Sequence, residues 1–224
     1  MKQGILNFKF SHNRDFFVSP KNSIAFNLIK SWPNWNIQMA YIYGPEKCGK
    51  TLISNLWQKK SNAKILDESK LKKFIKNSID IEDIKQNNWI IDNIEYFIEK
   101  KYDEKILNLI NIIFSSKDSF ILITSKNPPK FLNSKVKDLL SRLSSSIVIE
   151  VFQPDNDLLC KIIKKYLNER SISISKKSLE YLILRIERSY QDALGIAKKI
   201  DKLSLETHSN INYRFLKKLI DSGF

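Results

Sequence analysis

The sequence contains few of the residues that mark disulfide-stabilised or zinc-binding proteins. Its 224 residues include two cysteines, Cys48 and Cys160, which lie far apart, and two histidines, neither of which is near a cysteine pair. These numbers argue against a disulfide framework and a zinc-ligand pattern, and they fit a reducing cytosol. No apolar stretch is long enough to span a membrane, and the N-terminus has no apolar signal-peptide core. We therefore expect a cytoplasmic protein with no membrane association.

Acidic residues are also scarce relative to basic ones, with 24 Asp and Glu against 38 Lys and Arg and a net charge of +14. An anionic partner, such as DNA or an acidic protein face, would explain this excess. Because the lysines are scattered and Lys, Asn and Ile abound everywhere, a general compositional bias explains it at least as well. The length and the hydrophobic content of 42% suffice for one packed domain and a small second one.

Two of the five glycines lie in a segment that matches G-x-x-x-x-G-K-[ST] at every fixed position. A hydrophobic strand is expected before it at 39–43 and a helix after it at 52–57, which is the context that a phosphate-binding loop needs. The loop amides and the helix N-terminus would form an anion cradle, Lys50 would reach the outer phosphates, and Thr51 would hold Mg²⁺. The alternative is an ordinary glycine turn before a helix. The expected nucleotide-binding residues are Gly44, Pro45, Glu46, Lys47, Cys48, Gly49, Lys50 and Thr51.

Two further apolar segments predict buried parallel strands that end in polar residues. The strand at 89–92 ends in Asp92, which could hold Mg²⁺ or its water shell or could cap the next helix. Asn93 follows it, where ATPases of this class usually carry a second acid that activates the attacking water. Because Asn is a poor base, we expect slow hydrolysis in the chain's own site. The strand at 119–124 ends in Thr124, which could sense the outer phosphate or cap the following turn.

Apolar residues before the first predicted helix form another candidate contact with the nucleotide. We expect Ser19 to cap this helix, with Pro20 as its first residue and an end near Lys30. Phe17 and Val18, just before it, could lie against an adenine ring. They could equally pack onto the helix as a hydrophobic staple.

The strand–helix alternation ends after a last strand predicted at 147–151. The helix before that strand carries Arg142, which could reach a neighbour's phosphates across an interface or form an ordinary surface salt bridge. Four helices should follow, at about 155–170, 176–187, 190–205 and 212–221. They predict a helical lid on an α/β parallel-sheet core. Arg188 could fold back from this lid onto the nucleotide.

In this order, the motifs resemble the AAA+ domain of the bacterial replication initiator DnaA and, more closely, its homologous regulator family Hda in the alphaproteobacterial form. The resemblance covers nearly the whole chain. It includes the segment before the first helix (15–22), the Trp-Pro-Asn-Trp segment (29–35), Walker A (43–51), Walker B (90–93), sensor 1 (123–129), the arginine finger (140–143) and sensor 2 (188–194). It implies a flexible tail at 1–15, a P-loop AAA+ nucleotide-binding core with a parallel sheet at 16–152, and a C-terminal helical lid at 153–224.

The resemblance also implies a function. In the tail, Gln3, Leu6 and Phe8 match a sliding-clamp-binding pattern, Q-x-x-L-x-F, although Gly4-Ile5 differs from its all-apolar version. The chain would be a negative regulator of DNA replication initiation that binds ADP or ATP with Mg²⁺. Bound to the DNA polymerase III beta sliding clamp, and to DNA only through the clamp, it would meet the initiator DnaA. It would stimulate hydrolysis of the initiator's ATP, with Arg142 as an arginine finger in trans. Whether the chain forms a homodimer is left open by the sequence.

Two other interpretations compete with this one. An autonomous DNA-associated AAA+ ATPase, either a loader or a remodelling factor, would use the basic surface and bind bare DNA in a salt-dependent way. A small P-loop kinase is opposed by Asn93, by the helical lid and by the lack of a recognisable acceptor-site motif. The alternatives to a clamp-binding tail are a short edge strand and plain disorder.

Overall fold

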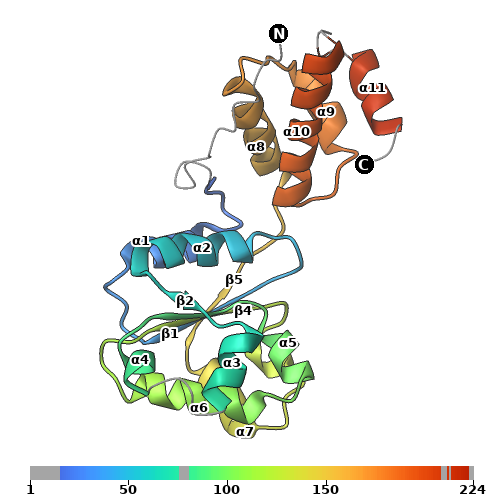
Figure 1. The fold of residues 1–224 in the computed structure, drawn as a ribbon. Coiled ribbons are helices and arrows are strands. Elements are labelled where there is room, and N and C mark those ends of the chain that lie inside the picture. The colour runs from blue at the N-terminus through green and yellow to red at the C-terminus, as the bar shows by residue number, and fades with distance from the viewer. Residues whose placement is uncertain (1–15, 76–80, 208–210, 212, 222–224) are drawn as a thin grey trace.

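The computed structural model describes residues 16–75, 81–207, 211 and 213–221. The clamp-binding pattern at Gln3, Leu6 and Phe8 therefore lies outside the described residues. Figure 1 shows an α/β core and a separate group of helices, which the chain enters after the last strand of the sheet. None of the described helices is long and apolar enough to cross a membrane.

The described part of the core contains a five-stranded sheet in the order β2-β3-β4-β1-β5, in which every pair of neighbours is parallel. Its strands are β1 (Met39–Tyr43), β2 (Lys64–Ile65), β3 (Trp89–Ile91), β4 (Ile121–Ser125) and β5 (Ile147–Glu150). The central strands are buried on both faces, which is why they read as continuous apolar runs. The parallel pairing places the carboxyl ends of β1, β3 and β4 at one edge.

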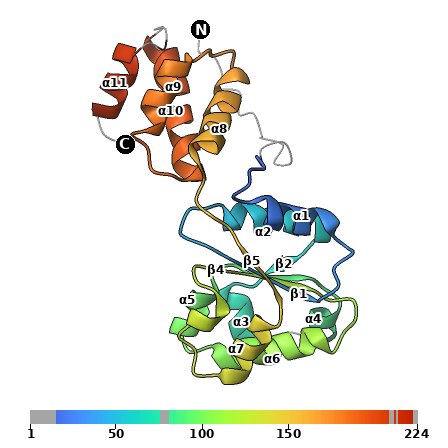
Figure 2. The same ribbon diagram turned by 180° about the vertical axis from the view of Figure 1, so that it is seen from behind.

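Helices cover both faces of this sheet. On one face lie α1 (Ser23–Ser31) and α2 (Lys50–Ser61). Figures 1 and 2 show the remaining core helices on the other face: α3 (Glu68–Ile75), α4 (Ile81–Lys85), α5 (Ile94–Glu99), α6 (Asp103–Phe114) and α7 (Lys137–Ser144). A short 3-10 helix, η1 (Pro129–Phe131), follows β4. Alternate residues of β1 serve the two faces: Met39 and Tyr41 pack toward α4–α7, and Ala40 and Ile42 pack toward α1 and α2.

After β5, the described chain forms helices only. They are α8 (Asn156–Asn168), α9 (Lys176–Ile183), α10 (Tyr190–Thr207) and α11 (Tyr213–Asp221), and they share an apolar core of their own. Asp155 caps α8 by accepting the Leu158 N–H at 2.8 Å, and Ser175 caps α9 by accepting the Ser178 N–H at 3.1 Å. The expected α/β parallel-sheet core with a C-terminal helical lid is confirmed.

The predicted start of the first helix is wrong. Ser19 does not cap it and Pro20 is not helical, because residues 19–22 form a turn and α1 begins at Ser23. In this turn the Ser19 N–H donates to Asn22 Oδ1 at 2.9 Å, and the Asn22 N–H donates to the Ser19 carbonyl at 3.1 Å. The predicted end of α9 also differs, since this helix ends at Ile183 rather than at 187.

Candidate nucleotide-binding site

The phosphate loop joins β1 to α2, and both of its glycines are required by geometry. A Cβ on Gly44 would lie 2.0 Å from the Val151 carbonyl oxygen, so no larger residue fits there. Gly49 precedes α2 with a φ of 107°, in the left-handed region that favours glycine. A Cβ on Gly49 would also lie 3.2 Å from the Tyr190 ring of the lid. The loop is therefore packed against Val151, the residue after β5, on one side and against α10 on the other.

The side chains of Lys50 and Cys48 lie on opposite sides of the distinction between ligand binding and packing: Lys50 lies over the loop and Cys48 is buried in the core. Lys50 lies over the loop, where its ammonium group donates to the carbonyls of Gly44 at 2.7 Å and Pro45 at 2.8 Å. Cys48 is buried in the core cluster beside α2, and burial raises the pKa of its thiol. Cys48 is thus a neutral packing residue, whereas the Lys50 ammonium group is placed to meet an anion cradled by the loop.

Side chains from α2, β3 and β4 meet at the carboxyl edge of the sheet. The Thr51 hydroxyl donates to Asp92 Oδ2 at 3.0 Å, and the Thr124 hydroxyl donates to Asp92 Oδ1 at 2.5 Å. The Thr124 hydroxyl also accepts the Asn93 N–H at 2.9 Å. Asp92 caps no helix, because the residue before α5 is Asn93, which has no side-chain capping bond. Asp92 faces the phosphate loop, and Thr124 holds it there.

These oxygen atoms suit a magnesium ion. Thr51 and Asp92 offer adjacent hydroxyl and carboxylate oxygens, the hard ligands that Mg²⁺ takes, with water and phosphate oxygens completing its coordination. In the described residues, no group of three or more His, Cys, Asp or Glu side chains could hold a metal ion. The geometry therefore fits the sparse protein ligand set of a phosphate-bound Mg²⁺ rather than an all-protein metal cage.

Glu95 is a residue of this edge that the motifs did not indicate. Its Oε1 accepts from the Ser125 hydroxyl at 2.5 Å, from the Lys126 N–H at 2.7 Å and from the Asn127 N–H at 3.1 Å. This carboxylate fixes the loop after β4. All three donors reach Oε1, whereas the buried Oε2 has no hydrogen-bond partner in the described residues. An acid in the first turn of a helix is common, so the sequence carries no signal of this role.

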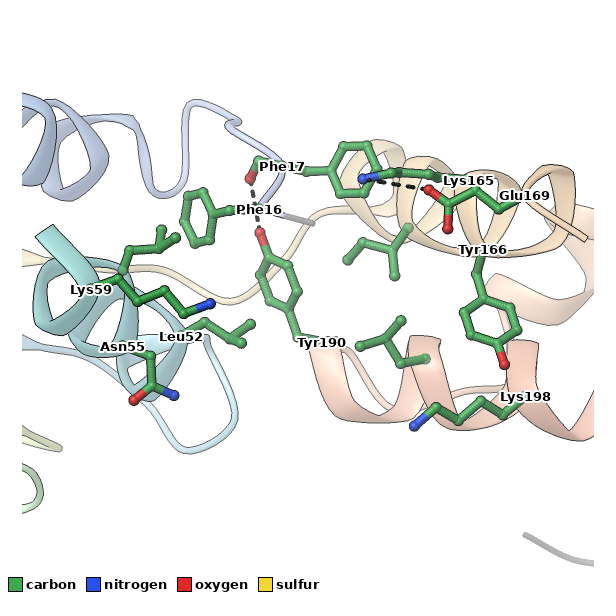
Figure 3. A pocket seen from close by; sticks show the side chains of 13 residues that line it. Phe16, Phe17, Leu52, Asn55, Lys59, Lys165, Tyr166, Glu169, Tyr190 and Lys198 are labelled. Carbon is green, nitrogen blue, oxygen red and sulfur yellow. Dashed lines mark hydrogen bonds and ion pairs between the residues drawn. The ribbon is translucent and has the colours of Figure 1, made fainter. Parts of the chain in front are cut away.

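The segment before α1 and the lid meet beside the phosphate loop. The Phe17 carbonyl accepts from the Tyr190 hydroxyl at 2.9 Å and from Asn22 Nδ2 at 2.9 Å, and Asn22 Nδ2 also donates to the Tyr190 hydroxyl at 3.0 Å. Burial raises the pKa of Tyr190, so its hydroxyl stays protonated and keeps donating. Figure 3 shows this contact between α2 on one side and the lid helices on the other.

A cavity of about 240 Å³ opens at this junction. Leu52, Asn55 and Lys59 of α2 form one wall, and residues of α8 and α10 form the other (Figure 3). Phe17 lines the cavity with its neighbour Phe16, whereas Val18 is 43% exposed and is absent from the lining. The structure thus brings Phe17 to a largely apolar cavity next to the phosphate-loop helix. Val18 lies outside it.

The turn that carries Arg188 is tied to the phosphate loop. Lys47, in the loop, forms ion pairs with Glu187 at 2.6 Å and with Asp192 at 3.7 Å. Arg188 itself is exposed. These exposed pairs contribute little stability, but they place the start of α10 beside the loop.

Arg142 lies apart from all of these residues. It is exposed in the last turn of α7, just before β5 begins at Ile147, and thus near the edge of the sheet where the strands start. The phosphate loop lies at the other edge, where β1 ends. The guanidinium carbon of Arg142 lies 5.5 Å from the centre of the Phe114 ring, and Arg142 forms no ion pair with any described residue.

Comparison with known proteins shows similarity to one part of the replication initiator protein DnaA. No protein-family model matches it. The chromosomal replication initiator protein DnaA of Nautilia profundicola is 25% identical over 205 residues, which cover 84% of this chain and 47% of that protein. The chain thus spans about half the length of this relative.

Solved structures agree with this similarity. Domain III of the Thermotoga maritima replication initiation protein DnaA matches 93% of this chain, and 95% of its own length, with a TM-score of 0.76 and 19% identity. The AMPPCP-bound DnaA of Aquifex aeolicus matches 88% of this chain, and 66% of its own, with a TM-score of 0.72 and 21% identity. The described chain has the AAA+ P-loop fold, and it is homologous to the DnaA-like AAA+ domain.

Proposed function

We propose that this chain is a negative regulator of DNA replication initiation that stimulates the hydrolysis of ATP bound to the initiator DnaA. The position of Arg142 carries the proposal. Arg142 is exposed, free of ion pairs to the described residues, and at the sheet edge away from its own phosphate loop. Such an arginine is available to the phosphates of a neighbouring molecule. An arginine finger supplied in trans can raise a hydrolysis rate by about 10³–10⁵.

In this proposal, the chain's own site binds ADP or ATP and hydrolyses ATP slowly. The phosphate loop and Lys50 hold the phosphates, Thr51 and Asp92 hold Mg²⁺, and Thr124 orients Asp92. When bound, Mg²⁺ neutralises phosphate charge and fixes the phosphate oxygens. Hydrolysis is slow because Asn93 supplies no base. The AMPPCP bound to the Aquifex relative supports nucleotide binding by this fold.

The nucleotide would also join the core to the lid. Phe17 lines the cavity beside α2 and is a proposed base contact. Val18, the next residue, is exposed outside the cavity and is proposed to contact the base from its rim. Arg188 would fold onto the outer phosphates from the lid. Because bound nucleotide would contact both parts, it would favour one arrangement of core and lid, in proportion to its difference in affinity for the two states.

The partners complete the proposal. A tail at 1–15 would dock Gln3, Leu6 and Phe8 as an extended peptide in a hydrophobic groove of the DNA polymerase III beta sliding clamp. The core at 16–152 and the lid at 153–224 would then meet the initiator on clamp-loaded DNA in the cytoplasm. A homodimer is compatible with this arrangement.

The experiment measures conversion of labelled ATP to ADP on the initiator from the same organism, with the clamp loaded on DNA. The wild-type chain should accelerate the conversion. Arg142→Ala should not accelerate it. Arg185→Ala is the matched control and should behave as the wild type, because Arg185 is also an exposed arginine over an aromatic ring, the Tyr181 ring of the lid. Removal of residues 1–10 should abolish the acceleration while nucleotide binding persists. Failure of the wild-type chain to accelerate conversion would refute the proposal.

The net charge of +14 favours a second candidate, an autonomous DNA-associated AAA+ ATPase. It differs in two measurable ways. The chain alone would hydrolyse ATP at an ordinary turnover rate of roughly 1–10³ s⁻¹, and bare DNA would bind it with an affinity that falls steeply with salt.

A further inference from the structure

Arg142 lies against an aromatic ring that the fold holds in place. Its guanidinium carbon is 5.5 Å from the centre of the Phe114 ring, within the roughly 6 Å range of a cation–π interaction. Phe114 is the last residue of α6, and its partly buried side chain packs against the core cluster on that face of the sheet. The ring is therefore fixed by packing, and the Arg142 side chain has a preferred position against it.

Arg142 forms no ion pair with the acid that lies one helical turn before it. Asp138 precedes Arg142 by four residues on α7, a spacing at which Asp and Arg side chains often pair. No Asp138–Arg142 ion pair forms, and the remaining described acids form none with Arg142 either. A carboxylate would occupy two of the five guanidinium N–H donors and would balance the charge. The ring face occupies no N–H donor, so both the charge and the donors stay available.

We infer that Phe114 is a positioning residue for Arg142, which it holds ready for the phosphates of a partner's nucleotide. The inference rests on the proposed function. A long arginine side chain loses rotamer freedom when it is fixed in a transition state. Restricting it beforehand against a ring reduces that loss when the partner arrives. At an exposed site, the cation–π interaction corresponds to about a two- to fivefold effect on rate.

The test uses the full-length chain, the initiator loaded with labelled ATP, and clamp on DNA. Phe114→Leu keeps an apolar side chain but removes the ring, and Phe114→Tyr keeps the ring. We expect Phe114→Leu to lower the maximal hydrolysis rate about two- to fivefold, with the half-saturating concentration of the chain unchanged. Phe114→Tyr should retain the wild-type rate.

A second readout reports the contact itself and needs no partner. In isotope-labelled full-length protein, the side-chain resonances of Arg142 should carry a ring-current shift. Phe114→Leu should abolish this shift and Phe114→Tyr should keep it. Absence of the shift in the wild-type chain would overturn the inference.

The outcomes separate this inference from the proposed function. If the wild-type chain accelerates hydrolysis, Arg142→Ala does not, and Phe114→Leu equals the wild type, the positioning role is wrong and the function stands. If Phe114→Leu lowers the rate although Arg142 of the wild-type chain shows no ring-current shift, the ring serves stability alone and the inference is wrong. If the wild-type chain gives no acceleration, the function fails, and the positioning role fails with it even where the ring-current shift shows the contact.

Discussion

Tyr190 joins the lid to the phosphate loop and to the segment before α1, so a change at its hydroxyl tests the contacts between these parts. It donates to the Phe17 carbonyl at 2.9 Å and accepts from Asn22 at 3.0 Å. Its ring stacks on Phe16 with centres 6.1 Å apart, and the ring edge faces Gly49. Tyr190→Phe removes the hydroxyl and leaves the ring contacts in place. The substitution therefore isolates the hydrogen bonds that join lid and core.

The structure sets the size of the effect. Two hydrogen bonds are lost, one buried and one partly buried, each with a net value of about 0.5–1.5 kcal/mol. Asn22 Nδ2 still donates to the Phe17 carbonyl at 2.9 Å, so neither remaining partner is left wholly unsatisfied. We expect a loss of about 1–2 kcal/mol of unfolding free energy. For a chain of this length, that corresponds to a fall in Tm of about 2–8 °C.

The assay is thermal unfolding with and without ADP. Tyr181→Phe serves as the matched control, because the Tyr181 hydroxyl makes no hydrogen bond with a described residue while its ring packs against Tyr213. Tyr190→Phe should lower Tm and weaken ADP binding, and the control should change neither. An unchanged Tm and ADP affinity in Tyr190→Phe would refute the view that this hydroxyl couples the lid to the nucleotide site.

Three further predictions concern the same region. Gly49→Ala should lower the unfolding free energy by about 1–3 kcal/mol, measured in urea, because its φ of 107° strains any residue with a Cβ. Thr124→Val should weaken binding of Mg²⁺-ADP in calorimetry, since Asp92 loses the hydroxyl that holds it, whereas Thr124→Ser keeps a hydroxyl and should bind as the wild type does. Glu187→Gln should strengthen ADP binding at low salt, because an acid paired with Lys47 of the phosphate loop is removed, and should have no effect near about 1 M salt, where these exposed charges are screened. Equal effects at both salt concentrations would contradict the ion-pair explanation.

The phosphate loop and the strands around it could be predicted because local physics dictates them. Gly44 leaves no room for a side chain beside the Val151 carbonyl, so the loop shows in the sequence as a fixed glycine. Strand β4 is buried along its whole length, so it shows as an apolar run ending in polar residues. The lid helices appear as repeated apolar positions with recognisable caps at Asp155 and Ser175.

Contacts between distant segments could not be predicted in this way. Asn22 and Tyr190 are 168 positions apart, and no periodicity or motif joins them. The predicted start of α1 was wrong because Ser19 has the chemistry of a cap, whereas the Asn22 side chain, which also donates to Tyr190 of the lid, accepts the Ser19 N–H in a turn that precedes the helix. The contact between Arg142 and Phe114 depends on how α6 packs against α7, which their sequences do not reveal.

The most direct test of the central claim is the single-turnover rate of ATP hydrolysis on the initiator at a saturating concentration of this chain, on clamp-loaded DNA. The wild-type chain should accelerate hydrolysis, and Arg142→Ala should lose about 10³-fold or more of that acceleration. An Arg142→Ala chain that accelerates hydrolysis as well as the wild type would contradict the role of Arg142 as an arginine finger in trans.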